Sequence, residues 1–254
     1  MSVNNRKNPR MNLRHARGLV RLPIFSASRA VSGTRYALIA LGLITGWGGA
    51  AGTRAADSMP FTIESRKTIS DLAAQSDTVS ELTLQLSIAN IDRWDDATMI
   101  TALRTAANLL TQCRIRISSA ELLHISVPDT HRHFDTPRSR EVARALTLPK
   151  PTLYFTAGTR QVPAFDAEAI GRGNSRTRPE LTNTIWIARG TRDLGQVIAH
   201  ELAHVLMDSG AHDNTPGNLM AEQTSPQQIQ LTPAQCAQMR STGMQNGLLQ
   251  PGLN

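Results

Sequence analysis

The chain has 254 residues, enough to bury a sizeable hydrophobic core, and its 27 Lys and Arg against 20 Asp and Glu give a formal charge of +7. The positive charge is confined to the N-terminus, because residues 1 to 56 contain nine Lys or Arg and no Asp or Glu. Without that segment 18 basic residues face 20 acidic ones, so residues 57 to 254 carry a net charge of −2. Residues 57 to 254 therefore lack the strong positive charge of a nucleic-acid-binding protein, and we expect no nucleic-acid partner.

An apolar run of about 16 residues, from Tyr36 to Ala51, follows the basic N-terminal segment and is itself followed by small residues. This layout is typical of a secretory signal peptide. The run is short and Gly-rich for a membrane span, which needs roughly 20 apolar residues, and an uncleaved N-terminal anchor is the alternative. We therefore expect an exported protein, periplasmic or secreted, with cleavage after Ala51, Ala55 or Ala56.

The first regular elements predict a strand–helix–strand unit. Residues 81 to 88 alternate Leu or Ile with polar residues, as a half-buried strand does. Residues 94 to 113 change to helical spacing, with one apolar stripe and with Asp95 or Asp96 placed to cap the helix. Residues 114 to 119 predict a second strand. This order favours two parallel strands joined by a crossover helix.

The second half of the chain predicts further strands between helices. Residues 140 to 146 read as a short helix, and residues 151 to 158 and 182 to 190 read as strands bounded by Pro and Gly. Thr191 opens a longer apolar helix, and residues 231 to 243 form a closing helix. We expect helices and strands in one domain.

The apolar helix after Thr191 contains His200, Glu201 and His204 in the order H-E-x-x-H. Residues four apart lie on one face of a helix, so both imidazoles can bind one metal ion. A catalytic zinc ion takes three protein ligands and keeps the fourth position for water, whose pKa it lowers. The motif therefore predicts a Zn²⁺ site in which Glu201 is the general base that accepts a proton from the zinc-activated water.

The third ligand must come from the residues after the helix. Asp208 continues the spacing of four, but at 1.5 Å per residue its Cα would lie about 12 Å from that of His200 along the helix axis. Gly210 is suited to end the helix in a left-handed turn, after which the chain can reverse and bring His212 to the metal. We expect His212 to be the third ligand; the alternatives are Asp208, Asp213 and Glu222.

The only two cysteines of the chain are Cys113 and Cys236. An even number of cysteines in an exported protein permits one disulfide bond. Two separate buried thiols are the alternative.

The stretch "HELAHVLMDSGAH", followed by "GNLM", resembles the metzincin clan of zinc metallopeptidases, in particular its matrixin-like bacterial members. In that clan a helix carrying H-E-x-x-H ends at a Gly, a third His follows, and a downstream Met forms a tight turn beneath the metal. Met220 matches that Met. The likeness covers roughly residues 80 to 242, and its specific part is confined to residues 200 to 220. The spacing differs, because seven residues separate His204 from His212 where metzincins have five, and Met207 occupies the usual Gly position.

The resemblance implies an α+β fold, α/β-like in its order, of the zincin type. It implies a twisted mixed sheet, an active-site helix, a Met-turn at Met220 and a C-terminal helix. The expected organisation is a basic n-region and signal peptide in residues 1 to 56, a polar linker or irregular start in residues 57 to 80, and the catalytic domain in residues 81 to 254.

The motif and the resemblance together predict an exported zinc metallopeptidase that acts on a peptide or protein substrate. His200, His204 and His212 would hold the ion, Glu201 would be the base, and Met220 would support the floor of the site. Two alternatives remain open: a non-catalytic exported binding or scaffold protein of the same fold, and a zinc amidase acting on cell-wall peptides. Glu201 favours an enzyme, because a structural zinc site needs no base. Membrane contact is expected only through an uncleaved N-terminal segment.

Overall fold

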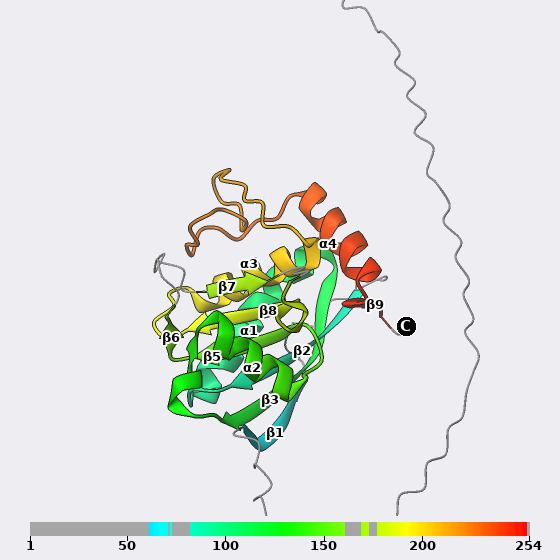
Figure 1. Ribbon diagram of the computed structural model, residues 1–254. Helices are drawn as coiled ribbons and strands as arrows, with labels where there is room; N and C mark the ends of the chain where they lie inside the picture. The colour runs from blue at the N-terminus through cyan, green and yellow to red at the C-terminus, as the bar shows by residue number, and fades with distance from the viewer. Residues whose placement is uncertain (1–60, 71, 73–81, 161–168, 173–176, 253–254) are drawn as a thin grey trace, which may run out of the picture. The chain divides into compact units, whose positions relative to one another are not determined.

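The computed structural model describes residues 61–70, 72, 82–160, 169–172 and 177–252 (Figure 1). All of them belong to one unit, Arg54–Asn254. The expected signal peptide lies outside the described residues. No helix in the described part of the chain is both long and apolar enough for a membrane span.

A seven-stranded mixed sheet forms the centre of the fold (Figure 1). Its strands lie in the order β1 (Thr62–Ser70), β3 (Ile115–Ser126), β2 (Leu82–Asn90), β5 (Thr152–Thr156), β8 (Thr184–Ala188) and β7 (Ala169–Arg172), and β9 (Leu249–Pro251) also pairs with β2. The four inner strands are parallel to one another, whereas β1, β7 and β9 run antiparallel to their partners. A separate pair is formed by β4 (His133–Phe134) and β6 (Gly158–Thr159). The predicted mixed α+β architecture is confirmed.

The crossover unit β2–α1–β3 has the form that the sequence predicts. β2 and β3 are parallel, and α1 (Asp96–Leu110) connects them through a 3-10 turn at Thr111–Cys113. Asp95 caps α1, because its carboxylate accepts a hydrogen bond of 2.8 Å from the Thr98 N–H. The apolar stripe of α1 is buried, and its buried members are Met99, Ala102, Leu103, Ala106, Ala107 and Leu110.

Strand β1 lies in the segment that the sequence predicts to be a linker or irregular start, so that prediction is wrong for residues 62 to 70. The strand pairs antiparallel with β3 along its whole length. It is an edge strand, and Ile69 is its only buried residue. The sequence "TIESRKTIS" therefore shows no clear apolar alternation, because backbone hydrogen bonds rather than buried side chains hold this strand to the sheet.

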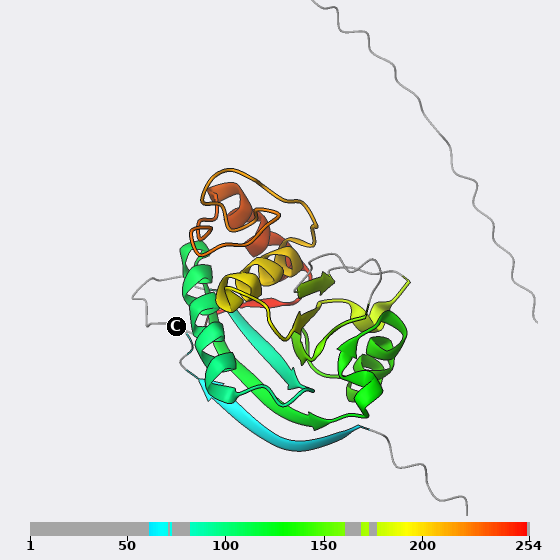
Figure 2. The same ribbon diagram turned by 90° about the vertical axis from the view of Figure 1, so that its left-hand side faces the viewer.

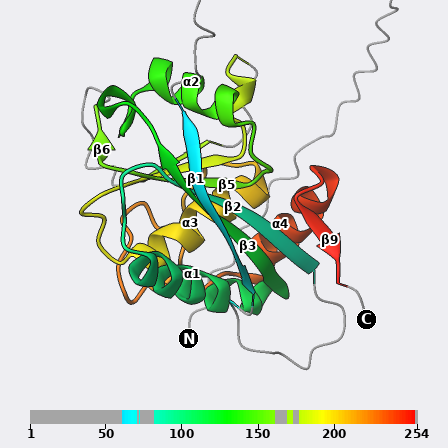
Figure 3. The same cartoon turned by 90° about the horizontal axis from the view of Figure 1, so that it is seen from below.

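Helices cover both faces of the sheet. On one face lie α1 and α3 (Leu194–Met207), and α4 (Pro233–Gln245) packs beside α3 (Figure 2). On the other face lies α2 (Thr136–Leu146), as the view from below shows (Figure 3). Each face has its own core: Met99, Leu202 and Met239 belong to the larger one, and Val142 packs with Trp186 in the smaller one. The remaining 3-10 turns are Asp129–His131 and Pro179–Leu181.

Two glycines allow α3 to lie close to its neighbours. A Cβ atom at Gly195 would come within 2.4 Å of the Thr105 Cβ, so only glycine permits this approach of α3 to α1. A Cβ at Gly243 in α4 would lie 2.7 Å from the Leu249 side chain and 3.2 Å from that of Leu206. Glycine at these two positions therefore lets α3, the helix that carries H-E-x-x-H, pack closely against α1 and α4.

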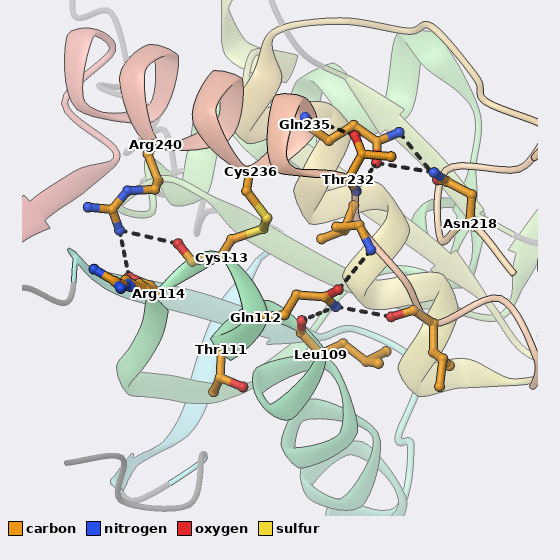
Figure 4. The surroundings of a disulfide bond; sticks show 12 residues. Leu109, Thr111, Gln112, Cys113, Arg114, Asn218, Thr232, Gln235, Cys236 and Arg240 are labelled. Atoms are coloured by element: carbon orange, nitrogen blue, oxygen red, sulfur yellow. Dashed lines mark hydrogen bonds between the residues drawn. A yellow bond between two sulfur atoms is a disulfide. The ribbon is translucent and has the colours of Figure 1, made fainter. Parts of the chain in front are cut away.

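The segment after α3 is tied to the end of α1 by covalent and hydrogen bonds (Figure 4). Cys113 and Cys236 form a disulfide bond with a Cα–Cα distance of 4.8 Å. The Gln112 side chain donates to the Ile229 carbonyl at 3.0 Å and accepts from the Leu231 N–H at 2.7 Å. Arg240 of α4 donates to the carbonyls of Cys113 and Arg114. The C-terminal part of the fold therefore has a fixed attachment beside α1.

Replacing both cysteines by serine should lower the free energy of unfolding by about 2–5 kcal/mol, because the unfolded chain loses a cross-link that closes a long loop. Urea unfolding of the parent and the double variant measures the loss. Reductant provides the control, since it should bring the parent to the level of the variant and leave the variant unchanged. A double variant as stable as the oxidised parent would show that the disulfide does not stabilise the fold.

Candidate metal centre

Helix α3 places the H-E-x-x-H residues between the core and solvent. His200 is buried with 4% of its surface exposed, whereas His204 is partly buried. The residues around them, including Ile198, Leu202 and Val205, are fully buried in the core. The apolar majority of α3 thus fixes the helix rigidly, and the two imidazoles emerge from it on one side.

The end of α3 differs from the expected one. The helix ends at Met207, and Asp208 follows in the left-handed region with φ 49° and ψ 44°. Gly210 does not have a positive φ, so the expectations that Gly210 makes the turn and that Asp208 stays on the helix are both wrong. Asp is among the few non-glycine residues that enter this region readily, which lets the chain turn two residues earlier than glycine alone would suggest.

The early turn brings His212 beside the two histidines of α3. The His204 Nε2 lies 2.9 Å from the His200 Nε2 and 3.2 Å from the His212 Nε2. One nitrogen from each ring lies within 4.8 Å of the others. Within the described residues this is the group of His, Cys, Asp and Glu side chains that could hold a metal ion, and it includes none of the alternative ligands Asp208, Asp213 and Glu222.

Backbone carbonyls fix the tautomers of the two helix histidines. The His200 Nδ1 lies 2.8 Å from the Leu219 carbonyl oxygen, and the His204 Nδ1 lies 2.7 Å from the Ser209 carbonyl oxygen. A carbonyl can only accept a hydrogen bond, so each Nδ1 carries the proton and donates it. In the neutral rings each Nε2 therefore presents a lone pair to the centre of the group.

This arrangement suits a cation. Two lone pairs that face each other across 2.9 Å repel unless a positive charge lies between them. Two nitrogens bound to one tetrahedral zinc ion at 2.0–2.1 Å would be roughly 3.3 Å apart, close to the two Nε2 separations observed. The residues present thus fit a divalent metal that accepts imidazole ligands.

Burial keeps the two helix imidazoles neutral. Desolvation lowers the pKa of His200, although the hydrogen bond to the Leu219 carbonyl opposes it. Desolvation, followed by the neighbouring His200, lowers the pKa of His204 to about 4. Both rings are therefore unprotonated at neutral pH, the state in which imidazole binds a metal.

The metal-free protein should lose stability as the pH falls from 6.5 towards about 4. In this window the unfolded chain binds protons at both imidazoles while the folded chain resists them, so acid favours unfolding. Urea unfolding of the chelator-treated protein at about pH 7 and about pH 5 measures the difference. A His204→Asn variant should show a smaller difference; an equal one would mean that His204 is not the residue that resists protonation.

Glu201 and Met220 occupy different environments near the histidines. Glu201 follows His200 on α3 and is partly exposed. Met220 is fully buried, its N–H donates to the Asn218 side chain at 2.8 Å, and its carbonyl accepts from the Asp213 N–H at 2.8 Å. Met220 directly follows Leu219, whose carbonyl orients His200. The hydrogen bonds of Met220 therefore help to fix the position of that carbonyl.

The sequence gives no indication of several groups that organise this centre. The carbonyls of Leu219 and Ser209 orient the imidazoles, but a backbone carbonyl has no signature in the side chains. The sequence also does not indicate that Asn218 and Gln235 contribute to this centre. Thr232 and Gln235 do have the Ser/Thr-x-x-Glu/Gln spacing of a capping box, which predicts the start of α4, but the pattern does not reveal that Gln235 also reaches Asn218.

No family model matches the sequence, and no curated protein matches it. Matches among solved structures include metalloproteinase-II from Bacteroides fragilis, with 14% sequence identity and a TM-score of 0.47. That match covers 69% of this chain and 57% of the other, so this chain spans less than two thirds of that protein.

Proposed function

We propose that this protein is a zinc-dependent peptidase whose metal is held by His200, His204 and His212. The observation that carries the proposal is the convergence of the three imidazole nitrogens, two of them with their lone pairs fixed toward a common point. Imidazole ligands suit zinc, and three protein ligands leave a fourth position for water or substrate.

The exposure of the three histidines supports a catalytic site over a structural one. His200 is buried, His204 is partly buried and His212 is exposed, so the group opens to solvent on the His212 side. A structural zinc site is usually closed by four protein ligands. The described part of the chain supplies three to this group, which favours an enzyme over a scaffold protein of the same fold.

Glu201 provides the base for hydrolysis. Zinc held by His200, His204 and His212 would supply Lewis acidity, which lowers the pKa of a water molecule and polarises a peptide carbonyl. Glu201 would be the general base: its carboxylate would accept the proton of the water that attacks the peptide carbonyl and would then donate it to the leaving amine. The two carbonyls that hold the Nδ1 protons of His200 and His204 keep these imidazoles in place throughout.

The resemblance to metzincins supports the same function in finer detail. The third histidine and Met220 follow the active-site helix in the order of that clan. The two extra residues between His204 and His212 are accommodated by the turn at Asp208. We propose a metzincin-like enzyme in which Met220 forms the floor of the metal site.

Export is a further part of the proposal. The N-terminal residues read as a signal peptide, and disulfides such as Cys113–Cys236 form and persist in oxidising compartments. Peptides or proteins outside the cytoplasm are therefore the proposed substrates.

Metal analysis and peptide cleavage test the proposal together. The purified protein should contain about one zinc ion per chain, cleave peptides in a mixed peptide library, lose this activity to a chelator and regain it with zinc. Zinc without cleavage of any peptide would favour the scaffold protein. Cleavage restricted to cell-wall peptides would favour the amidase.

A further inference from the structure

Asn218 lies buried in the segment that returns from His212 to α4, with 3% of its surface exposed. Its side-chain oxygen accepts hydrogen bonds from the Met220 N–H at 2.8 Å and from the Gln235 amide at 3.3 Å. Its side-chain nitrogen donates to the Asp213 carboxylate and to the Gln235 oxygen, both at 3.2 Å. Every hydrogen-bonding direction of this amide is therefore used within the protein.

These bonds connect Asn218 to the residue that follows His212 and to the segment that orients His200. Asp213 directly follows His212, and its backbone N–H also donates to the Met220 carbonyl. Leu219 directly follows Asn218 and presents the carbonyl that accepts the His200 Nδ1 proton. The position of one amide thus determines where the His212 segment lies and where the carbonyl that orients His200 points.

Gln235 gives this arrangement a fixed support. Its side chain accepts from the Thr232 N–H at 2.8 Å and completes the capping box of α4. The next residue, Cys236, is bonded to Cys113 beside the end of α1 (Figure 4). Asn218 is therefore held by a helix terminus that is itself covalently attached to the main body of the fold.

We propose that Asn218 is a positioning residue of the metal centre, which sets the places of His200 and His212 through its hydrogen bonds. This inference rests on the metal site of the proposed function. Groups that orient metal ligands without touching the metal typically change metal affinity about 10- to 100-fold when they are removed. Asn218→Ala should therefore lower zinc affinity by about this factor.

A charge-conserving exchange separates positioning from general packing. In Asn218→Asp the carboxylate still accepts from the Met220 N–H, but it loses the donor to Asp213 and places two carboxylates at hydrogen-bonding distance. Asp213→Asn alone loses the matching acceptor. The double variant Asp213→Asn with Asn218→Asp restores one donor and one acceptor, so both single variants should lose affinity and the double variant should return to within about threefold of the parent.

The experiment measures zinc affinity of the full chain by competition with a chromophoric chelator, together with the absorption spectrum of the cobalt-substituted protein, which reports ligand geometry. Urea unfolding of the metal-free variants records stability separately. Arg240→Ala is the matched control, because Arg240 also lies on α4 but its side chain donates to the Cys113 and Arg114 carbonyls after α1. It should keep parental affinity and an unaltered cobalt spectrum.

Three results overturn the proposal. Parental zinc affinity in Asn218→Ala would show that the amide does not position the ligands. A double exchange that remains as weak as Asn218→Asp would show that the donor–acceptor pairing is irrelevant, and this comparison holds even where Asn218→Ala does not fold. Absence of zinc binding by the parent itself would overturn the proposed function together with this inference, whereas the first two results leave the proposed function standing.

Discussion

Glu201→Gln should abolish peptide hydrolysis while the protein keeps its zinc. The amide of glutamine has nearly the same shape as the carboxylate but cannot accept a proton, so the water that attacks the peptide is no longer deprotonated. Loss of a general base typically costs about 10²- to 10⁴-fold in rate, and we expect kcat to fall by at least the upper part of this range. Cleavage of a fluorogenic peptide and metal analysis of the same sample measure both quantities.

Glu222→Gln is the matched control for this result. Glu222 is an exposed acid close in sequence to Met220, and it lies outside the group of three histidines. Its neutralisation should leave zinc content and kcat near those of the parent. A Glu201→Gln enzyme that cleaves as fast as the parent would show that another group is the base.

His212→Ala should weaken zinc binding as severely as His204→Ala does, by several orders of magnitude, because each variant removes one of the three proposed ligands. Asp208→Asn should be mild by comparison. Asparagine tolerates the left-handed conformation that Asp208 adopts, so this variant removes the carboxylate without straining the turn. Competition with a chelator gives the affinity of each variant.

The comparison also decides between the candidate ligands. If His212→Ala kept nearly parental affinity while Asp208→Asn or Glu222→Gln lost it, the third ligand would be a carboxylate. The centre would then differ from that of metzincins in its ligand set as well as its spacing.

The elements with buried apolar patterns could be predicted from the sequence, because burial produces periodicity. The apolar residues of α1 and α3 recur with the 3.6-residue period of a helix, and β2 alternates apolar with polar residues over most of its length. β1 could not be predicted, because a solvent-exposed edge strand leaves most of its residues free to be polar. The parallel pairing of β2 with β3 followed from their order and from the helix between them.

Part of the metal centre could be predicted from the sequence and part could not. His200, Glu201 and His204 lie on one helix, so their spacing alone predicts their proximity. His212 reaches the same point only through the turn at Asp208, whose conformation depends on backbone hydrogen bonds to His204 and Val205 that no sequence pattern specifies. Glycine is the residue type expected at such a turn, which favours Gly210, whereas the structure places the turn at Asp208.

X-ray absorption at the zinc edge of the purified protein tests the central claim most directly, because it reports the atoms bound to the metal. We expect three imidazole nitrogens and one oxygen at about 2.0–2.1 Å, with one nitrogen lost in His212→Ala. A sulfur ligand, or a fourth imidazole that closes the site, would contradict an open catalytic zinc centre formed by His200, His204 and His212.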